Sequence, residues 1–180
     1  MTSLFQSITP RTAGFNTTDL SKFSETGQMM TLLLMLTGGA PGSTAGGMKI
    51  TTVAVLVAAT VSVFRKRDSA HILRRRVSDE TVKNAATILV MYITLFVFGA
   101  MVISSIESLP LTDCLYETAS AIGTVGLTTG ITPSLSAVSR IVLIILMYMG
   151  RVGGLTIVFA TFGSTQKNLV KYPQATITVG

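Results

Sequence analysis

The feature that most constrains this chain is a segment of 22 residues, 85–106, that carries no charge (AATILVMYITLFVFGAMVISSI). As a helix at about 1.5 Å per residue it is long enough to cross the hydrocarbon core of a bilayer, which is about 30 Å thick. Composition agrees, because charged residues make up 12% of the chain, against about 25% in soluble domains. We therefore predict an all-α membrane protein.

A run of cations lies between two apolar segments. It consists of Arg65, Lys66, Arg67, Arg74, Arg75, Arg76 and Lys83. Beside apolar segments, the excess of Lys and Arg in cytoplasmic loops explains such a run more simply than nucleic-acid binding does. We predict no nucleic-acid partner and a multi-pass protein of the plasma membrane, with loop 64–83 and tail 164–180 in the cytoplasm. Five acidic residues then fall on the external side: Asp19, Glu25, Glu107, Asp113 and Glu117.

Two hexapeptides 112 positions apart share the form T-(small apolar)-G-(large apolar)-x-T, and each precedes a long apolar segment. They are residues 12–17, TAGFNT, and 124–129, TVGLTT. A glycine beside small or β-branched residues lets successive carbonyls point the same way, as a dehydrated cation requires. One such motif would be explained by helix caps and turns, whereas two in repeated positions indicate an ion selectivity filter. The predicted ion-binding residues, acting through their carbonyls, are Thr12, Ala13, Gly14, Phe15, Thr124, Val125, Gly126 and Leu127.

Each motif follows a short segment that we predict to be a re-entrant helix. The first lies within residues 1–11, and the second begins at 109–110 and ends at Gly123. Asp113 and Glu117 are expected near the start of the second helix, where the helix dipole favours acids, and the negative end of each helix would favour a cation. Spanning helices are predicted at 83–106 and 138–162.

The first half also contains two apolar runs, 28–40 and 50–63, and each is too short to span alone. They are separated by TGGAPGSTAGG at 37–47, so we predict one crossing that is broken in its middle. Aligning the halves leaves five extra residues in this loop. Irregular backbone at that depth is tolerated where it lines a cavity or packs in protein. The loop is a candidate gate, formed by Gly38, Gly39, Gly42, Ser43, Thr44, Ala45, Gly46 and Gly47 together with Arg151.

Arg151 and Lys49 are cations inside apolar crossings, where a charge is costly and usually has a partner. Arg151 aligns with Gly39, so we predict that it donates hydrogen bonds to loop carbonyls and holds the loop across the pore. For Lys49, a functional role and snorkelling toward the cytoplasm stay open. Arg140 is expected to anchor at the interface.

Other functions have less support in the sequence. No catalytic combination of side chains can be assembled, so no enzyme is predicted. Cys114 and His71 are single, and we expect no resident metal and no cofactor, only a transported cation. The glycine-rich loop lacks the G-K-[ST] ending of a phosphate cradle. A carrier-type secondary transporter with its substrate site at the broken helix is the alternative, although such carriers often have inverted repeats and these halves run parallel.

These motifs resemble the Trk/Ktr/HKT superfamily of potassium transporters. The resemblance rests on the paired filters, the loop 38–47, Gly150-Arg151-Val152-Gly153, and the closing 171–173 Lys-Tyr-Pro with Gly180, which is most similar to Ktr B membrane subunits. It implies four parallel helix–re-entrant pore helix–helix repeats around a pseudo-fourfold pore. Residues 1–76 would be the third repeat without its first helix and residues 77–180 the fourth, so two repeats would be missing. It also implies a homodimer on a cytoplasmic nucleotide-binding regulatory ring, and potassium uptake, passive or by sodium-stimulated symport.

Overall fold

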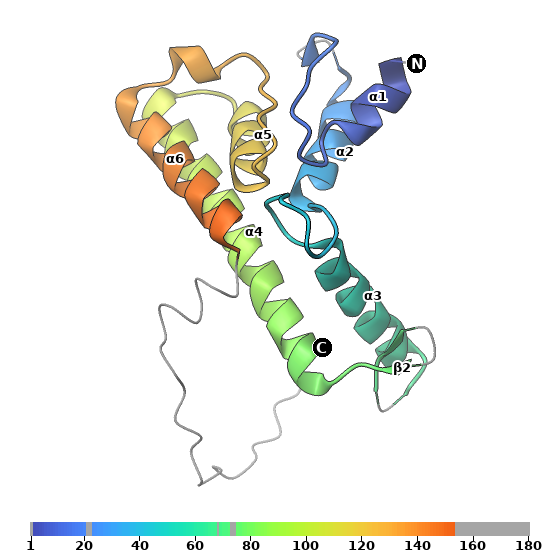
Figure 1. The fold of residues 1–180 in the computed structure, drawn as a ribbon. Helices are drawn as coiled ribbons and strands as arrows, with labels where there is room; N and C mark the ends of the chain where they lie inside the picture. The colour runs from blue at the N-terminus through green and yellow to red at the C-terminus, as the bar shows by residue number, and fades with distance from the viewer. Residues whose placement is uncertain (1, 21–22, 68, 73–74, 154–180) are drawn as a thin grey trace, which may run out of the picture.

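The computed structural model describes residues 2–20, 23–67, 69–72 and 75–153 (Figure 1). Its helices are α1 (Thr2–Ile8), α2 (Glu25–Leu36), α3 (Ile50–Phe64), α4 (Asp79–Glu107), α5 (Leu111–Ile122) and α6 (Ala137–Val152). Strands β1 (His71–Ile72) and β2 (Arg75–Arg76) form an antiparallel pair between α3 and α4, with His71 opposite Arg76. The described part is therefore mainly helical, as predicted, and the short strand pair is an addition that the sequence did not reveal.

Helix α4 is the long apolar helix that the uncharged segment predicts. Among the described residues it is the one helix long and apolar enough, by length and composition, to cross a membrane. It begins earlier than predicted because the Ser78 side chain caps it by accepting a hydrogen bond from the amide of Thr81. It ends at Ser108, whose φ of 55° is left-handed.

Helices α4 and α6 run side by side in opposite directions, and the short α5 packs against both (Figure 1). Glu107 joins the two long helices, because its Oε1 accepts hydrogen bonds from the Ser136 amide at 2.9 Å and the Ser139 hydroxyl at 2.5 Å. Residues 108–135 are thus an excursion that leaves α4 and returns to α6 at the same end. α5 begins after Pro110, as predicted.

The closing crossing was predicted as a helix from 138 to 162, and this is wrong at its C-terminal end. α6 ends at Val152 and Gly153 has a φ of 88°, a left-handed conformation that a continuing α-helix does not contain. Residues 154–162 lie outside the described part of the chain. The sequence did give the start of the helix correctly, because Ser136 caps its first turn through its hydroxyl.

The predicted break is present, because α2 and α3 are two short helices separated by the glycine-rich loop (Figure 1). The loop is closed at its neck, where Thr37 and Met48 form a parallel bridge and the Gly38 amide donates to the Met48 carbonyl at 2.7 Å. Gly38 is required there, because an added Cβ would lie 2.2 Å from the carbonyl oxygen of Gly46. The two ends of the loop therefore lie close together, between the end of α2 and the start of α3.

Two groups of buried side chains hold these elements together. One forms where α4, α5 and α6 meet and includes Ile103, Cys114, Ile122, Leu143 and Leu146. The other lies between α2, α5 and the second hexapeptide and includes Met35, Tyr116, Val125 and Leu127. The second group fixes the hexapeptide to the helices by apolar burial.

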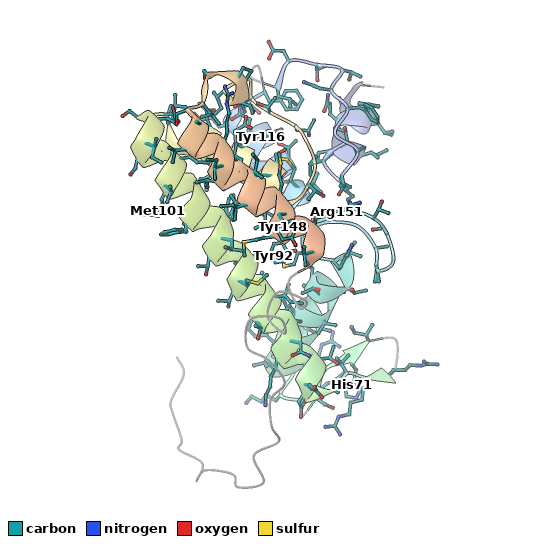
Figure 2. The ribbon with its side chains drawn as sticks, turned by 60° about the vertical axis from the view of Figure 1, so that its left-hand side comes forward. His71, Tyr92, Met101, Tyr116, Tyr148 and Arg151 are labelled. Carbon is teal, nitrogen blue, oxygen red and sulfur yellow. The ribbon has the colours of Figure 1, made fainter. Side chains whose placement is uncertain are left out.

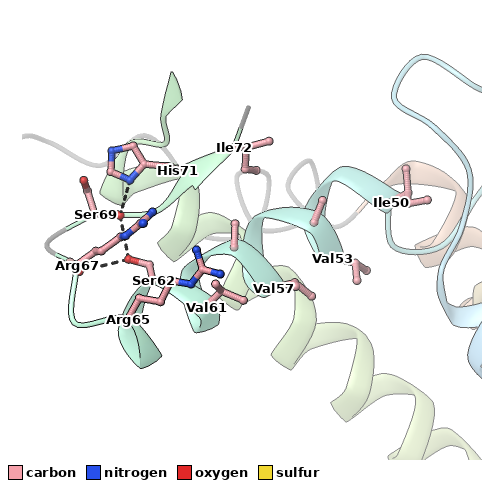
Figure 3. A pocket seen from close by; sticks show the side chains of 12 residues that line it. Ile50, Val53, Val57, Val61, Ser62, Arg65, Arg67, Ser69, His71 and Ile72 are labelled. Atoms are coloured by element: carbon pink, nitrogen blue, oxygen red, sulfur yellow. Dashed lines mark hydrogen bonds between the residues drawn. The ribbon is translucent and has the colours of Figure 1, made fainter. Parts of the chain in front are cut away.

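The strand pair packs against the end of α3. Ser62 donates through its hydroxyl to the carbonyls of Arg67 and Ser69, at 3.3 and 2.9 Å (Figure 3). A pocket opens here between the valine face of α3, the arginines 65 and 67, and β1. Figure 2 shows His71 at one end of the molecule and Tyr116 near the other, so this basic end lies far from α5 and the second hexapeptide.

Candidate ion filter and adjoining loop

Both hexapeptides have the same backbone signature. Thr12 and Gly14 have φ values of 69° and 73°, and Thr124 and Gly126, at the equivalent positions, have 52° and 89°. The residue between them does not have positive φ in either motif. A positive φ is strained for a β-branched residue, and strain at matching positions points to a functional constraint. Alternating handedness turns successive peptide units so that their carbonyls can face one side.

The two motifs lie directly against each other. A Cβ added to Gly14 would lie 2.2 Å from the carbonyl oxygen of Val125, so the second motif passes where any side chain at Gly14 would need to be. The structure thus brings together two segments separated by 112 positions. Gly126 is different, because nothing lies within 4 Å of a Cβ built there.

The ends of α1 and α5 lead into the motifs by the same kind of hydrogen bond. The Gly14 amide donates to the Thr9 carbonyl at 3.3 Å, and the Val125 amide donates to the Ser120 carbonyl at 2.9 Å. Each bond joins residues five positions apart and closes a turn of six residues, so the motif bends back under the helix that precedes it. The candidate ion path therefore begins where the negative end of each helix dipole lies.

One predicted ligand is partly occupied. The carbonyl of Phe15 accepts a hydrogen bond from the Thr9 hydroxyl at 2.6 Å, which leaves it one lone pair. The side chains of the motifs also differ: Val125 and Leu127 are buried, whereas Phe15 is 71% exposed. The second motif is therefore anchored in the core through its side chains, and the first is anchored through its backbone and Thr9.

The glycine-rich loop contacts the second motif. The Gly46 amide donates to the Thr124 hydroxyl oxygen at 3.1 Å, and an added Cβ at Gly46 would lie 2.3 Å from that oxygen. The Gly47 amide donates to the Gly150 carbonyl of α6 at 3.3 Å. Ala45 is half-buried, and Gly46 and Gly47 are buried. This side of the loop thus lies between the second motif and α6.

The opposite side of the loop is held by two cations. Arg151 donates from Nη1 to the carbonyl of Thr44, and Figure 2 places it beside the loop. Lys49 donates from Nζ to the carbonyls of Ser43 and Ala45, at 3.2 and 2.5 Å. The hydrogen bond predicted for Arg151 is present. For Lys49 the structure decides against snorkelling toward the cytoplasm, because its ammonium turns back to the loop.

The remaining loop residues divide by position. Gly38 and Gly39 form the neck, where the Ile50 amide donates to the Gly39 carbonyl at 3.2 Å. Gly42, Ser43 and Thr44 form an exposed tip, and Gly42 has a φ of 82° with nothing near an added Cβ. Arg140 lies at the far end of α6 and donates to the Pro133 carbonyl at 2.7 Å. It therefore belongs to the other end of the molecule from Arg151.

Glu117 was predicted near the start of its helix as a dipole-stabilising acid, and this role is wrong. It lies in the middle of α5, is 4% exposed, and accepts hydrogen bonds from the last residue of the second motif, Thr129, and from Thr132 beyond it. Gln6 of α1, which no sequence motif indicated, is 5% exposed and donates to Asn16 near the end of the first motif and to Thr18 just beyond it. The position of Glu117 three residues after Cys114 and four before Ala121, on one helical face, could have indicated its burial.

Within the described ranges, the structure contains no group of three or more His, Cys, Asp or Glu side chains able to hold a metal ion. The groups available to a cation at the paired motifs are backbone carbonyls and threonine hydroxyls. Such oxygens replace the hydration shell of an alkali cation.

Comparison with known proteins identifies the family. The model of the TrkH family, described as cation transport protein, matches residues 1–172. The chain belongs to this family. It is a family of transport proteins, not of enzymes, and with the long apolar α4 this makes the chain a membrane protein. The predicted resemblance to the Trk/Ktr superfamily is confirmed.

Relatives at 33–38% identity have more specific names than the family model, and these names refer to potassium uptake. The Ktr system potassium uptake protein B of Bacillus subtilis is 36% identical over 178 residues, which cover 99% of this chain and 40% of the relative. The potassium/sodium uptake protein NtpJ of Enterococcus hirae is 38% identical over 184 residues, covering 99% and 41%. The Ktr B protein of Vibrio alginolyticus is 33% identical over 180 residues, covering 100% and 39%. This TrkH-family chain thus spans about two-fifths of the length of these relatives.

Proposed function

We propose that this chain is part of the potassium-translocating membrane subunit of a bacterial uptake system. Cations pass through a filter to which residues 12–15 and 124–127 each contribute one wall. The observation that carries this function is the shared backbone signature: left-handed threonine and glycine at equivalent positions of two segments that touch. Neither motif contains an acidic, basic, histidine or cysteine side chain, which catalysis or metal binding would use.

Potassium is the proposed cargo because the relatives are named for its uptake, and NtpJ is named for sodium as well. A backbone-carbonyl filter suits K⁺, whose hydration shell is easily exchanged for carbonyl dipoles. Sodium is proposed as a stimulating ion. A carrier with its substrate at the broken helix is less favoured, since the loop interior is taken up by Lys49, Arg151 and the contact with Thr124.

The proposed assembly follows from the two-repeat organisation. Residues 1–76 and 77–180 would be two of four parallel repeats around a pseudo-fourfold pore, so two further repeats complete the filter. The functional unit would be a homodimer on a cytoplasmic nucleotide-binding ring, as the resemblance to Ktr B subunits implies. Loop 64–83 and the C-terminus would face the cytoplasm.

The glycine-rich loop is proposed as the gate. It contacts the filter at Thr124, is held from the side by Arg151 and Lys49, and is narrow at its neck. A loop joined to the rest of the protein by a few hydrogen bonds can move between discrete positions when its flanking helices shift. Its cations would also raise the barrier for a passing K⁺ in the closed position.

The test is ion flux through the intact parent protein reconstituted in liposomes. We expect uptake of ⁸⁶Rb⁺ that external K⁺ suppresses more strongly than external Na⁺ does. Empty liposomes treated in the same way are the control. Absence of Rb⁺ uptake in well-folded protein, or equal suppression by K⁺ and Na⁺, would contradict a potassium-selective filter.

A further inference from the structure

One carboxylate holds the C-terminal end of the second motif and the turn that follows it. Glu117 accepts a hydrogen bond through Oε1 from the Thr129 amide at 3.1 Å and another from the Thr128 hydroxyl at 2.5 Å. Its Oε2 accepts from the Thr132 hydroxyl at 2.8 Å. With 4% of its surface exposed, Glu117 is buried behind the filter and reaches three positions of the segment that continues from Leu127.

The first half has a neutral counterpart at the same place. Gln6 is buried in α1 and donates through Nε2 to the Asn16 side-chain oxygen at 3.2 Å and the Thr18 hydroxyl at 2.8 Å. At the offset of 112 residues, Asn16 corresponds to Thr128, and Gln6 falls one position from Glu117. Both halves therefore fix the outgoing end of the filter from the preceding helix, one with an amide and the other with a charge.

We propose that Glu117 is a positioning residue for the filter and that its charge contributes to ion selectivity. This rests on the proposed function, since it assigns a role at the same pore. A carboxylate in a buried site is costly unless donors compensate it, and its three donors here are two hydroxyls and one amide, none of them charged. Charge-assisted bonds of this kind are stronger than neutral ones and hold the chain more tightly.

The hydrogen bonds of Glu117 and its negative charge both favour ion selectivity. Tight bonds to residues 128, 129 and 132 restrict how far the carbonyls of 124–127 can move, so the spacing that suits one cation is kept. The negative charge of Glu117 behind the filter favours a cation in it, because electrostatic interactions are strong where water is excluded. Gln6 supplies the first effect without the second, so the two walls of the filter are unequal.

The experiment measures the ratio of K⁺ to Na⁺ suppression of ⁸⁶Rb⁺ uptake for the intact parent protein and its variants. Glu117→Gln keeps the size and the hydrogen-bonding capacity and removes the charge, so we expect the ratio to fall about fivefold, the difference between a charge-assisted and a neutral bond. Thr132→Val removes one donor, and we expect a smaller fall. The double variant should fall no further than Glu117→Gln, because both changes act on one network.

Asp113→Asn is the matched control, an acid on the same helix one turn earlier and only half-buried. Its ratio should stay within about twofold of wild type, since it makes no bond to the filter segment. A merely structural role for Glu117 would lower the amount of folded protein and leave the ratio unchanged. If Glu117→Gln and Thr132→Val still take up K⁺ and keep the wild-type ratio, Glu117 does not position the filter. Loss of uptake in wild type would instead reject the proposed function.

Discussion

At the scale of single residues, the two filter glycines share a conformation and differ in their surroundings. Both have φ near 80°, where a side chain is strained. At Gly14 the space for a Cβ is already taken by the Val125 carbonyl, whereas at Gly126 it is empty. Conformation is therefore the constraint at Gly126, and close approach of another chain segment is added to it at Gly14.

We therefore predict that Gly14→Ala harms ion selectivity more than Gly126→Ala. Gly126→Ala should cost about 1–2 kcal/mol of stability from backbone strain alone. Gly14→Ala should cost more and displace the Val125 carbonyl. Rb⁺ uptake with K⁺ or Na⁺ competition, together with thermal unfolding, measures both effects. Equal loss of selectivity in the two variants would mean that the contact with Val125 does not shape the filter.

At the scale of elements, the glycine-rich loop is hydrogen-bonded on one side to the candidate filter and on the other side to Arg151 and Lys49. The neck at Thr37 and Met48 keeps its ends together, so the loop can shift without separating α2 from α3. Gly46 lies against Thr124, and Gly42 at the tip has open space around it. A side chain added at position 46 would therefore clash with Thr124, whereas one added at position 42 would not clash with another residue.

Gly46→Ala should push the loop away from the filter, because the new methyl group would overlap the Thr124 side chain. We expect higher ion flux and weaker dependence on the cytoplasmic partner. Gly42→Ala, in the same loop, strains the backbone at a φ of 82° but overlaps no neighbouring atom, so it is the control for strain without a clash and should raise flux less. If the two variants behave alike, the contact between Gly46 and Thr124 does not hold the loop closed.

Arg151→Gln and deletion of residues 41–44 should also raise flux, since each removes the hydrogen bond between Arg151 and Thr44. The effect of Arg151→Gln should be partial, because Lys49 still holds Ser43 and Ala45, and adding Lys49→Gln should increase it. Arg140→Gln, at the far end of α6, is the control. Unchanged or lower flux in folded protein from both Arg151→Gln and the deletion would remove the loop from the gating mechanism.

At the scale of the whole molecule, the described part is polarised. The basic strand pair and the end of α3 lie at one end, and the tie between Glu107, Ser136 and Ser139 lies at the other (Figures 1 and 2). The length of α4 between these ends is that of one membrane crossing. The two ends are therefore expected on opposite sides of the bilayer, with the arginines in the cytoplasm.

Cysteine labelling from outside the cell should modify Ser134→Cys and leave Arg75→Cys unmodified, since both positions are exposed and lie at opposite ends. The wild-type protein is the control, because its Cys114 is fully buried. After the membrane is made permeable, Arg75→Cys should label as well. The reverse pattern would invert the topology.

Much of the fold was predictable because it depends on local properties. The uncharged segment required α4, Pro110 and Gly123 bounded α5, and the paired hexapeptides indicated two segments with the same backbone conformation. Even the bond between Arg151 and the loop followed from aligning the halves, because a costly intramembrane charge needs a partner at the same depth. Each of these inferences used the spacing or chemistry of neighbouring residues.

The sequence by itself thus determined the helices, their membrane character and the positions of the candidate filters. Only the tertiary structure decided that Gly14 lies against Val125, that Lys49 turns back to the loop, and that Glu117 is buried beside the second motif instead of lying near the start of its helix. The reason is physical. Helix formation depends on residues a few positions apart, whereas these contacts join segments whose approach is set by the packing of α2, α5 and α6 as a whole.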